Sequence, residues 1–438
     1  MWKLIKILLA GIAVSFYFFP FEFTFLPGVN TKMAMAGVGL VLYALDLAKG
    51  RAPQINRDGF QIAVIAALVS LCGLASVIIN NTNDYTYATY IVSMFVWLGG
   101  AYTAVKIVKW LHGYVSAELI CNYIIGVCVG QCILALLIDL IPNIKFAVEK
   151  YVLGFDFVSV DRLDATGRLY GIGAAVDVAG TRFSASLIMI AFLLQNTQQC
   201  NLISYRYVYV ISFLIIAVVG NMIARTTTVG LVMAVVYLIF KSDIHVLQLN
   251  QRNKKIWETI FILLLCIVPI LIYLYNNNGN LHNSLRFAFE GFFSIAEKGH
   301  WETNSNNILR NMMVFPDNIG TWIIGDGYFD NPYHTDPYYV GERTGGFYKG
   351  TDIGYLRFIF YFGVLGLAMF ILLFIKVARS CMCRMISFKT LFVWLLVLNL
   401  IIWLKVSSDI FVVFALFLCI SLEKHQSYED SLPDPLDV

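Results

Sequence analysis

Long apolar runs, separated by short polar stretches, recur along almost the whole chain. A helix needs about 20 mainly apolar residues to cross the hydrocarbon core of a bilayer, and the chain offers twelve such runs. They cover roughly residues 4–20, 33–48, 59–79, 88–105, 118–142, 171–195, 207–223, 226–240, 257–275, 353–375, 390–405 and 408–422. The pattern predicts an all-α polytopic membrane protein with about 12 transmembrane helices.

The composition agrees with this class of protein. Apolar and aromatic residues make up 59% of the 438 positions, and charged residues only 13%. A soluble domain has about 25% charged residues, and a disordered chain cannot be this apolar. The net charge of +3 is too small to indicate a nucleic-acid partner. The nine cysteines form no CxxC pair and no spacing typical of zinc, so we expect neither disulfides nor a metal.

Basic residues in the connections predict the orientation. With a cytoplasmic amino terminus, the cytoplasmic segments hold seventeen lysines and arginines, and the short outward connections hold three. The positive-inside rule then places both termini in the cytoplasm. The amino-terminal run resembles a signal peptide, but residues 19–22 lack a small-residue cleavage site, so we interpret it as the first span.

Two outward segments are too long to be simple connections, namely residues 143–170 and 276–351. Long ordered loops of this kind are usually functional. The second is both polar and aromatic, which favours a folded cap, and residues 282–297 have the spacing of an amphipathic helix that lies in the interface or packs on the bundle. The predicted organisation is 1–275 with transmembrane helices 1–9 and the loop near 143–170, 276–352 as a large periplasmic loop, 353–422 with transmembrane helices 10–12, and 423–438 as a cytoplasmic tail.

Charged residues in or beside the spans are the main functional candidates, because a charge in the hydrocarbon core costs several kcal/mol unless it is paired or hydrated. These are mostly arginines near the outward side: Arg168 before the sixth span, Arg182 within it, Arg225 opening the eighth, and Arg357 in the tenth. A guanidinium group binds phosphate through two parallel hydrogen bonds. The set therefore predicts a site for a phosphate or diphosphate headgroup.

Each arginine also has a plainer interpretation. Arg182 pairs with Asp177 or reaches the interface, and Arg357 pairs with Asp352 as a structural lock. Arg225 is an interfacial anchor at a helix end, and the arginine before the sixth span faces water. The sequence leaves both kinds of interpretation open.

The string Gly350-Thr351-Asp352-Ile353-Gly354-Tyr355-Leu356-Arg357 leads into the tenth span. Asp352 is a carboxylate at the membrane boundary, where it can take the proton of a sugar hydroxyl as a general base. It is also a natural N-cap for that span, and the two roles are compatible. Upstream, Gly325-Asp326-Gly327 is interpreted as a turn rather than as a metal or sugar site.

Three stretches resemble those of a known family: residues 167–173, 224–230 and 325–366. With the many spans and the large late loop, they make the chain similar to the bacterial O-antigen polymerase (Wzy-type) and O-antigen ligase superfamily. Ligases of this superfamily typically carry a histidine and a polar residue where this chain has Asp352 and Ile353. The departure favours the polymerase branch.

The resemblance also implies site residues. Arg168 and Arg225, and with them Arg182, fall where family members place diphosphate-binding arginines. Arg343 is a further candidate for substrate binding, because an arginine and a following glycine have the family's spacing at Arg343 and Gly354. Arg357 and Tyr355 are added from the string above, and Asp352 is the catalytic candidate.

The activity implied by the resemblance is that of a membrane glycosyltransferase of polysaccharide or lipopolysaccharide biosynthesis. Such an enzyme moves a glycan from undecaprenyl diphosphate to the hydroxyl of a lipid-linked repeat unit at the periplasmic face of the bacterial inner membrane. Because arginines can stabilise the leaving diphosphate, no metal or other cofactor is expected. The expected partners are undecaprenyl-diphosphate-linked oligosaccharides, membrane lipids and a chain-length regulator, but not nucleic acid.

Other functions stay open at this point. An O-antigen ligase would share the fold and transfer the finished glycan to the lipid A core, and a peptidoglycan polymerase would share a late outward loop. A lipid-linked oligosaccharide flippase or other transporter is the non-enzyme alternative. It predicts charges distributed through the bilayer and needs no folded cap, so the gathering of charges on one side favours an enzyme.

Overall fold

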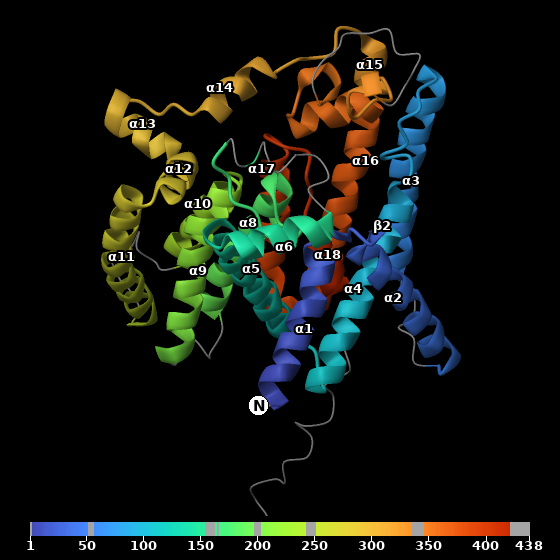
Figure 1. The fold of residues 1–438 in the computed structure, drawn as a ribbon. Helices are drawn as coiled ribbons and strands as arrows, with labels where there is room; N and C mark the ends of the chain where they lie inside the picture. The colour runs from blue at the N-terminus through green and yellow to red at the C-terminus, as the bar shows by residue number, and fades with distance from the viewer. Residues whose placement is uncertain are drawn as a thin grey trace, which may run out of the picture.

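The fold is described from a computed structural model of the 438-residue chain. The structure describes residues 2–50, 57–153, 163, 166–196, 203–241, 251–334 and 346–420. The chain is 78% helical, and its long helices run side by side from one end of a bundle to the other (Figure 1). The prediction of an all-α membrane protein is confirmed at this level.

Each predicted apolar run overlaps a helix of the bundle. These helices are α1 (Trp2–Phe18), α2 (Thr31–Ala48), α3 (Arg57–Asn80), α4 (Tyr90–His112), α5 (Ala117–Leu140), α8 (Val176–Asn196), α9 (Ile203–Ile223), α10 (Thr227–Lys241), α11 (Gln251–Asn277), α16 (Gly354–Arg384), α17 (Lys389–Ile402) and α18 (Phe411–Leu418). Eight helices in the described part of the chain are long and apolar enough to cross a membrane. Because α1, α10, α17 and α18 are shorter, the count of about twelve spans stays a prediction.

Four short helices follow one another across one end of the bundle (Figure 1). They are α12 (Gly279–Ala288), α13 (Glu290–Lys298), α14 (Asn304–Asn311) and α15 (Ile319–Ile323), and we call this end the cap side. The predicted helix over 282–297 is thus two helices, since Phe289 leaves the helical path at the start of α13. Leu281 and Leu285 of α12 are buried, and α12 packs on α9 and α11. This part of the predicted helix therefore packs on the bundle.

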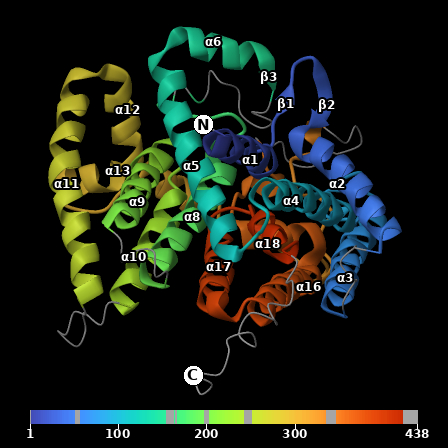
Figure 2. The ribbon, with the colours of Figure 1, turned by 90° about the horizontal axis from the view of Figure 1, so that it is seen from below.

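The remaining elements are small. Helix α6 (Pro142–Tyr151) leads into a three-stranded sheet in which β1 (Glu22–Phe23) pairs antiparallel with both β2 (Leu26–Asn30) and β3 (Val152–Leu153). The 3-10 helices are η3 (Pro332–His334), η4 (Tyr348–Gly350) and η5 (Ile386–Phe388). In Figure 2 the sheet lies at the edge of the bundle beside α1 and α2.

Helix α8 forms the centre of the bundle. Its side chains from Ala179 to Leu194 are all buried. Small residues permit this, because a Cβ added at Gly230 of α10 would lie 2.2 Å from the Cα of Ser184. The Ser184 hydroxyl donates to the carbonyl of Thr226 at 3.0 Å and accepts from the Gly230 amide at 3.2 Å. These contacts fix the turn between α9 and α10.

Helix α16 is broken near its cap-side end. Gly363 adopts φ 69°, which favours glycine, and a Cβ there would lie 2.1 Å from the carbonyl oxygen of Ile323. The segment after α15 docks at this break: the Asp326 amide donates to the carbonyl of Phe360 at 2.6 Å. The Asp326 carboxylate accepts from the hydroxyls of Thr321 and Tyr348. These structural contacts support the turn interpretation of Asp326.

Candidate functional site

Arg225 lies in the tight turn between α9 and α10 and contacts the cap. Its Nη1 lies 2.5 Å from Oε2 of Glu290 in α13, and its Nε donates to the carbonyl of Phe287 at 2.9 Å. The guanidinium carbon lies 4.0 Å from the centre of the Phe287 ring, and that of Arg168 lies 4.8 Å from the same centre. Two arginines far apart in the sequence thus meet at one aromatic ring. Arg225 therefore contacts the cap rather than only anchoring a helix end, and its role in binding stays a prediction.

Lys405, in the connection between α17 and α18, lies beside the two arginines. Its Nζ is 3.9 Å from Oδ1 of Asp177 and 3.4 Å from Oγ1 of Thr226, whose hydroxyl also donates to Asp177. The charges of Arg168, Arg225 and Asp352 act on Lys405 as well. We call the set the cap-side cluster: Arg168, Asp177, Arg225, Asp352 and Lys405.

Asp352 precedes α16 but does not cap it. The N-cap residue is Ile353, whose amide donates to Oγ1 of Thr351 at 3.4 Å, and no side chain caps the helix. The N-cap interpretation is therefore wrong. Burial and the negative charge of Asp177 raise the pKa of Asp352 to about 7, against the opposing charges of Arg357 and Lys405. A carboxyl group that titrates near neutral pH can both take up and give back a proton.

Arg357 and Tyr355 make structural contacts at the start of α16, next to Asp352. Nη2 of Arg357 lies 2.6 Å from Oδ1 of Asp330, whereas its Nη1 is 3.9 Å from Oδ1 of Asp352. The predicted lock therefore forms mainly with Asp330, a partner that the sequence did not suggest. The Tyr355 hydroxyl donates to the carbonyl of Leu400 at 2.9 Å, which ties α16 to α17.

Arg182 lies apart from the cap-side cluster. It is 5% exposed in α8, and its guanidinium carbon lies 5.4 Å from the centre of the Phe19 ring and 5.8 Å from that of Trp97. Its predicted pair with Asp177 does not form, because Asp177 contacts Lys405 and the turn after α9 instead. Arg343, the remaining candidate, lies outside the described residues.

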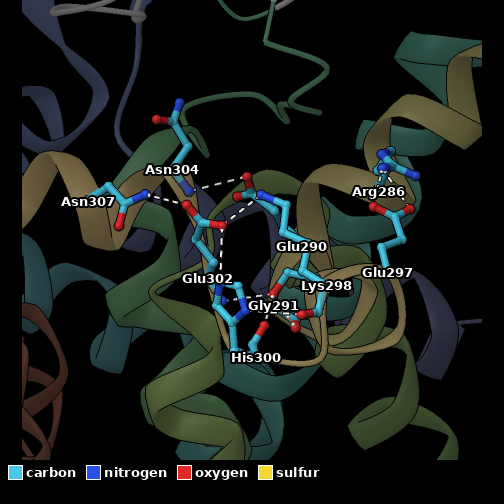
Figure 3. A network of polar contacts seen from close by, with 10 residues as sticks. Arg286, Glu290, Gly291, Glu297, Lys298, His300, Glu302, Asn304 and Asn307 are labelled. Carbon is cyan, nitrogen blue, oxygen red and sulfur yellow. Dashed lines mark hydrogen bonds and ion pairs between the residues drawn. The ribbon is translucent and has the colours of Figure 1, made fainter.

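A cavity of about 620 Å³ opens under the cap helices, and Arg225 lines it. Its wall is rich in charged and amide side chains, which Figure 3 shows linked to one another. Arg286 pairs with Glu297 at 2.8 Å, Lys298 pairs with Glu302 at 2.6 Å, and Asn307 donates to Glu302 at 3.0 Å. Cavities of roughly 300–1,000 Å³ hold small-molecule ligands. Because Arg225 belongs to both, the cavity adjoins the cap-side cluster.

Sequence reasoning missed the place of Lys405 in the cap-side cluster. The residue entered the argument only as one of three basic residues on the predicted outward side. Its signal was present, however, because a lysine between two short apolar runs on the predicted outward side runs against the positive-inside rule. Asp177 was noticed, but with the wrong partner.

The residues of the cap-side cluster come from the loop before α8, from α8 itself, from the α9–α10 turn, from the loop before α16 and from the α17–α18 connection. The cluster combines three cations with two carboxylates, which suits an anionic substrate that reacts by proton transfer. Comparisons with models of known protein families, with curated proteins and with solved structures found no match.

Proposed function

We propose that the protein is a membrane glycosyltransferase that transfers a glycan from undecaprenyl diphosphate to the hydroxyl of a lipid-linked repeat unit. The single observation that carries the proposal is that Arg168 and Arg225 meet at the Phe287 ring, while the charge of Lys405 acts on both arginines and on Asp352. Cations from separate segments, close to one carboxyl group that titrates near neutral pH, are what the departure of a diphosphate and the attack of a hydroxyl require.

In this reaction the acceptor hydroxyl attacks the anomeric carbon of the donor sugar. Its oxygen forms the new glycosidic bond, while the bond between the anomeric carbon and the phosphate oxygen breaks and its electron pair stays on the diphosphate. Arg168, Arg225 and Lys405 stabilise the charge that develops on the diphosphate. Asp352 accepts the hydroxyl proton.

The cavity under the cap is the proposed glycan site. Carboxylates and amides supply hydrogen-bond partners for sugar hydroxyls, and the rings of Phe287 and Phe293 supply apolar faces. Since Arg225 lines the cavity, a glycan bound there would extend from a diphosphate bound at the cap-side cluster.

Glu290 occupies the position that an anionic substrate would take at Arg225. Its carboxylate lies 2.5 Å from Nη1 of Arg225. A diphosphate that binds this guanidinium has to displace Glu290, and with it the start of α13. Donor binding would thereby loosen the cap helix that lines the glycan cavity.

The test is chain elongation by the purified full-length protein in lipid vesicles, with an undecaprenyl-diphosphate-linked repeat unit as the only substrate. We expect a ladder of longer glycans from the wild type and from Asp317→Asn, an exposed control in the cap segment. Asp352→Asn should lower the rate about 100-fold or more, because it removes the general base. Full activity of Asp352→Asn at equal folded amounts would overturn the role of Asp352.

A cellular experiment separates the proposed polymerase from the related functions. Deletion should leave lipopolysaccharide capped with a single repeat unit if the protein is a polymerase, and bare core if it is a ligase. Vesicles that translocate the lipid-linked unit without lengthening it would indicate a carrier and would overturn the proposal.

A further inference from the structure

A second group of charges lies within the bundle, apart from the cap-side cluster. Lys32 at the start of α2, Arg182 in α8 and Asp409 in the α17–α18 connection act electrostatically on one another. We call these three residues the inner cluster. They come from three separate segments of the chain, so only the packing of the bundle brings them together.

The three charges converge without pairing. Among the described residues, no ion pair joins Asp409 to Lys32 or to Arg182, and the Asp409 carboxylate accepts from the amide of Phe411 at 2.8 Å. The ammonium group of Lys32 lies 4.1 Å from the centre of the Trp97 ring instead. Lys32 and Arg182 therefore meet at one aromatic ring without an ion pair to Asp409.

Arg182 has donors without acceptors. The residue is only 5% exposed, and its Nε and Nη1 atoms have no hydrogen-bond partner. The surrounding rings of Phe18, Phe19 and Trp97 contribute only weak cation–π attraction. A buried guanidinium group whose N–H donors have no acceptor is destabilising, so an acceptor is expected beside it.

The charges do not balance either. Two cations act on one carboxylate, which leaves a surplus of one positive charge where the start of α2 meets Arg182 of α8. Water can satisfy the open N–H groups, but it cannot compensate the surplus charge. A small monovalent anion does both.

A small cavity lies next to the cluster. It has a volume of about 160 Å³ and is lined by Asp409, by Trp97, by Tyr87 and Tyr90, and by the hydroxyl-bearing residues Thr86 and Ser93. Lys32 and Arg182 lie on the far side of its wall, where both contact the Trp97 ring. The cavity is large enough for several water-sized ligands. It has little room for a lipid diphosphate with its glycan, and the charge of a diphosphate would exceed the surplus at the cluster.

We propose that Lys32 and Arg182 bind one small monovalent anion such as chloride, with Asp409 as the opposing charge that limits its affinity. The anion would accept hydrogen bonds from the open donors of Arg182 and would link α2 to α8. The proposal concerns a site separate from the cap-side cluster and does not depend on the glycosyltransferase activity.

The test compares the thermal midpoint of the purified full-length protein in sodium chloride and in sodium gluconate at equal ionic strength. We expect chloride to raise the midpoint in a saturable manner, by about 2 °C at tenfold the half-saturating concentration. Arg182→Gln and Lys32→Gln should abolish this difference, whereas Arg379→Gln, an exposed control on α16, should keep it.

Asp409→Asn should strengthen chloride binding, whereas the other two variants should abolish it. A gain of affinity cannot result from misfolding, so this variant is the control for folding. Removing the nearby negative charge should lower the half-saturating chloride concentration about tenfold. Crystals grown in bromide should in addition show an anomalous peak between Lys32 and Arg182. Equal thermal midpoints in chloride and gluconate would overturn the anion site. A dependence of the midpoint on sodium that Asp409→Asn abolishes would also overturn it and would indicate a cation site instead.

Discussion

The cap-side cluster and the inner cluster contain the same kinds of residue but differ in how their charges are satisfied. In the first, Arg225 pairs with Glu290 at 2.5 Å and Lys405 lies 3.9 Å from Asp177, with side chains that stay partly exposed. In the second, Arg182 is 5% exposed and has open donors. Partly exposed pairs can exchange partners at modest cost, whereas a buried charge without a partner is destabilising unless it is compensated. The two proposals follow this difference, with substrate exchange at the first cluster and stable ion binding at the second.

The largest effect is expected from Arg225→Ala in the cap-side cluster. The rate of chain elongation should fall about 100-fold, because one donor to the developing diphosphate charge is lost. Arg310→Ala, an exposed arginine of α14, is the matched control and should retain the wild-type rate. Equal elongation rates for Arg225→Ala and Arg310→Ala in the vesicle assay would show that Arg225 does not stabilise the diphosphate.

A smaller effect is expected for Lys405→Gln, measured as a shift of the pH–rate profile. The elongation rate requires the deprotonated form of Asp352, so it should rise with pH through the Asp352 pKa of about 7. The positive charge of Lys405 lowers that pKa. Its removal therefore raises the pKa of Asp352, and the midpoint of the profile moves to higher pH.

The control for this shift is Lys389→Gln, which changes an exposed lysine at the start of α17. Its profile should coincide with that of the wild type. A Lys405→Gln profile with an unchanged midpoint, even at a reduced rate, would mean that Lys405 does not act on Asp352 in the working enzyme.

The smallest effect is expected for Glu290→Gln. This change removes the carboxylate that competes for Arg225, so the affinity for undecaprenyl diphosphate should increase about threefold, in line with the modest strength of partly exposed ion pairs. Equilibrium binding in vesicles measures it, with Glu258→Gln on α11 as an exposed control. Weaker binding by Glu290→Gln would show that the carboxylate positions Arg225 rather than competes for it.

Local features of the site were well predicted from the sequence. The short α9–α10 turn with Arg225 and the turn at Asp326 lie where apolar periodicity and glycine placement put them. Such features depend on neighbours within a few positions, which hydrophobic spacing encodes directly.

Partners across the bundle were predicted poorly. Arg357 was assigned to Asp352, yet its closest carboxylate is Asp330. Arg182 was offered Asp177 as a partner, yet it lies among the rings of Phe18, Phe19 and Trp97, where the charge of Asp409 acts on it. In both cases the carboxylate nearest in sequence was chosen, whereas the neighbours of a charge are decided by which helices pack together.

The sequence by itself determined that this chain forms a bundle of apolar helices, with a polar segment after α11 and with Arg225 in the short α9–α10 turn. Hydrophobic burial in a bilayer depends on composition and spacing, and both can be read along the chain. The tertiary structure alone decided that Lys405 joins Asp177 while Arg182 does not. Small residues such as Ser184 and Gly230 set how closely helices approach, and this distance determines which charges meet.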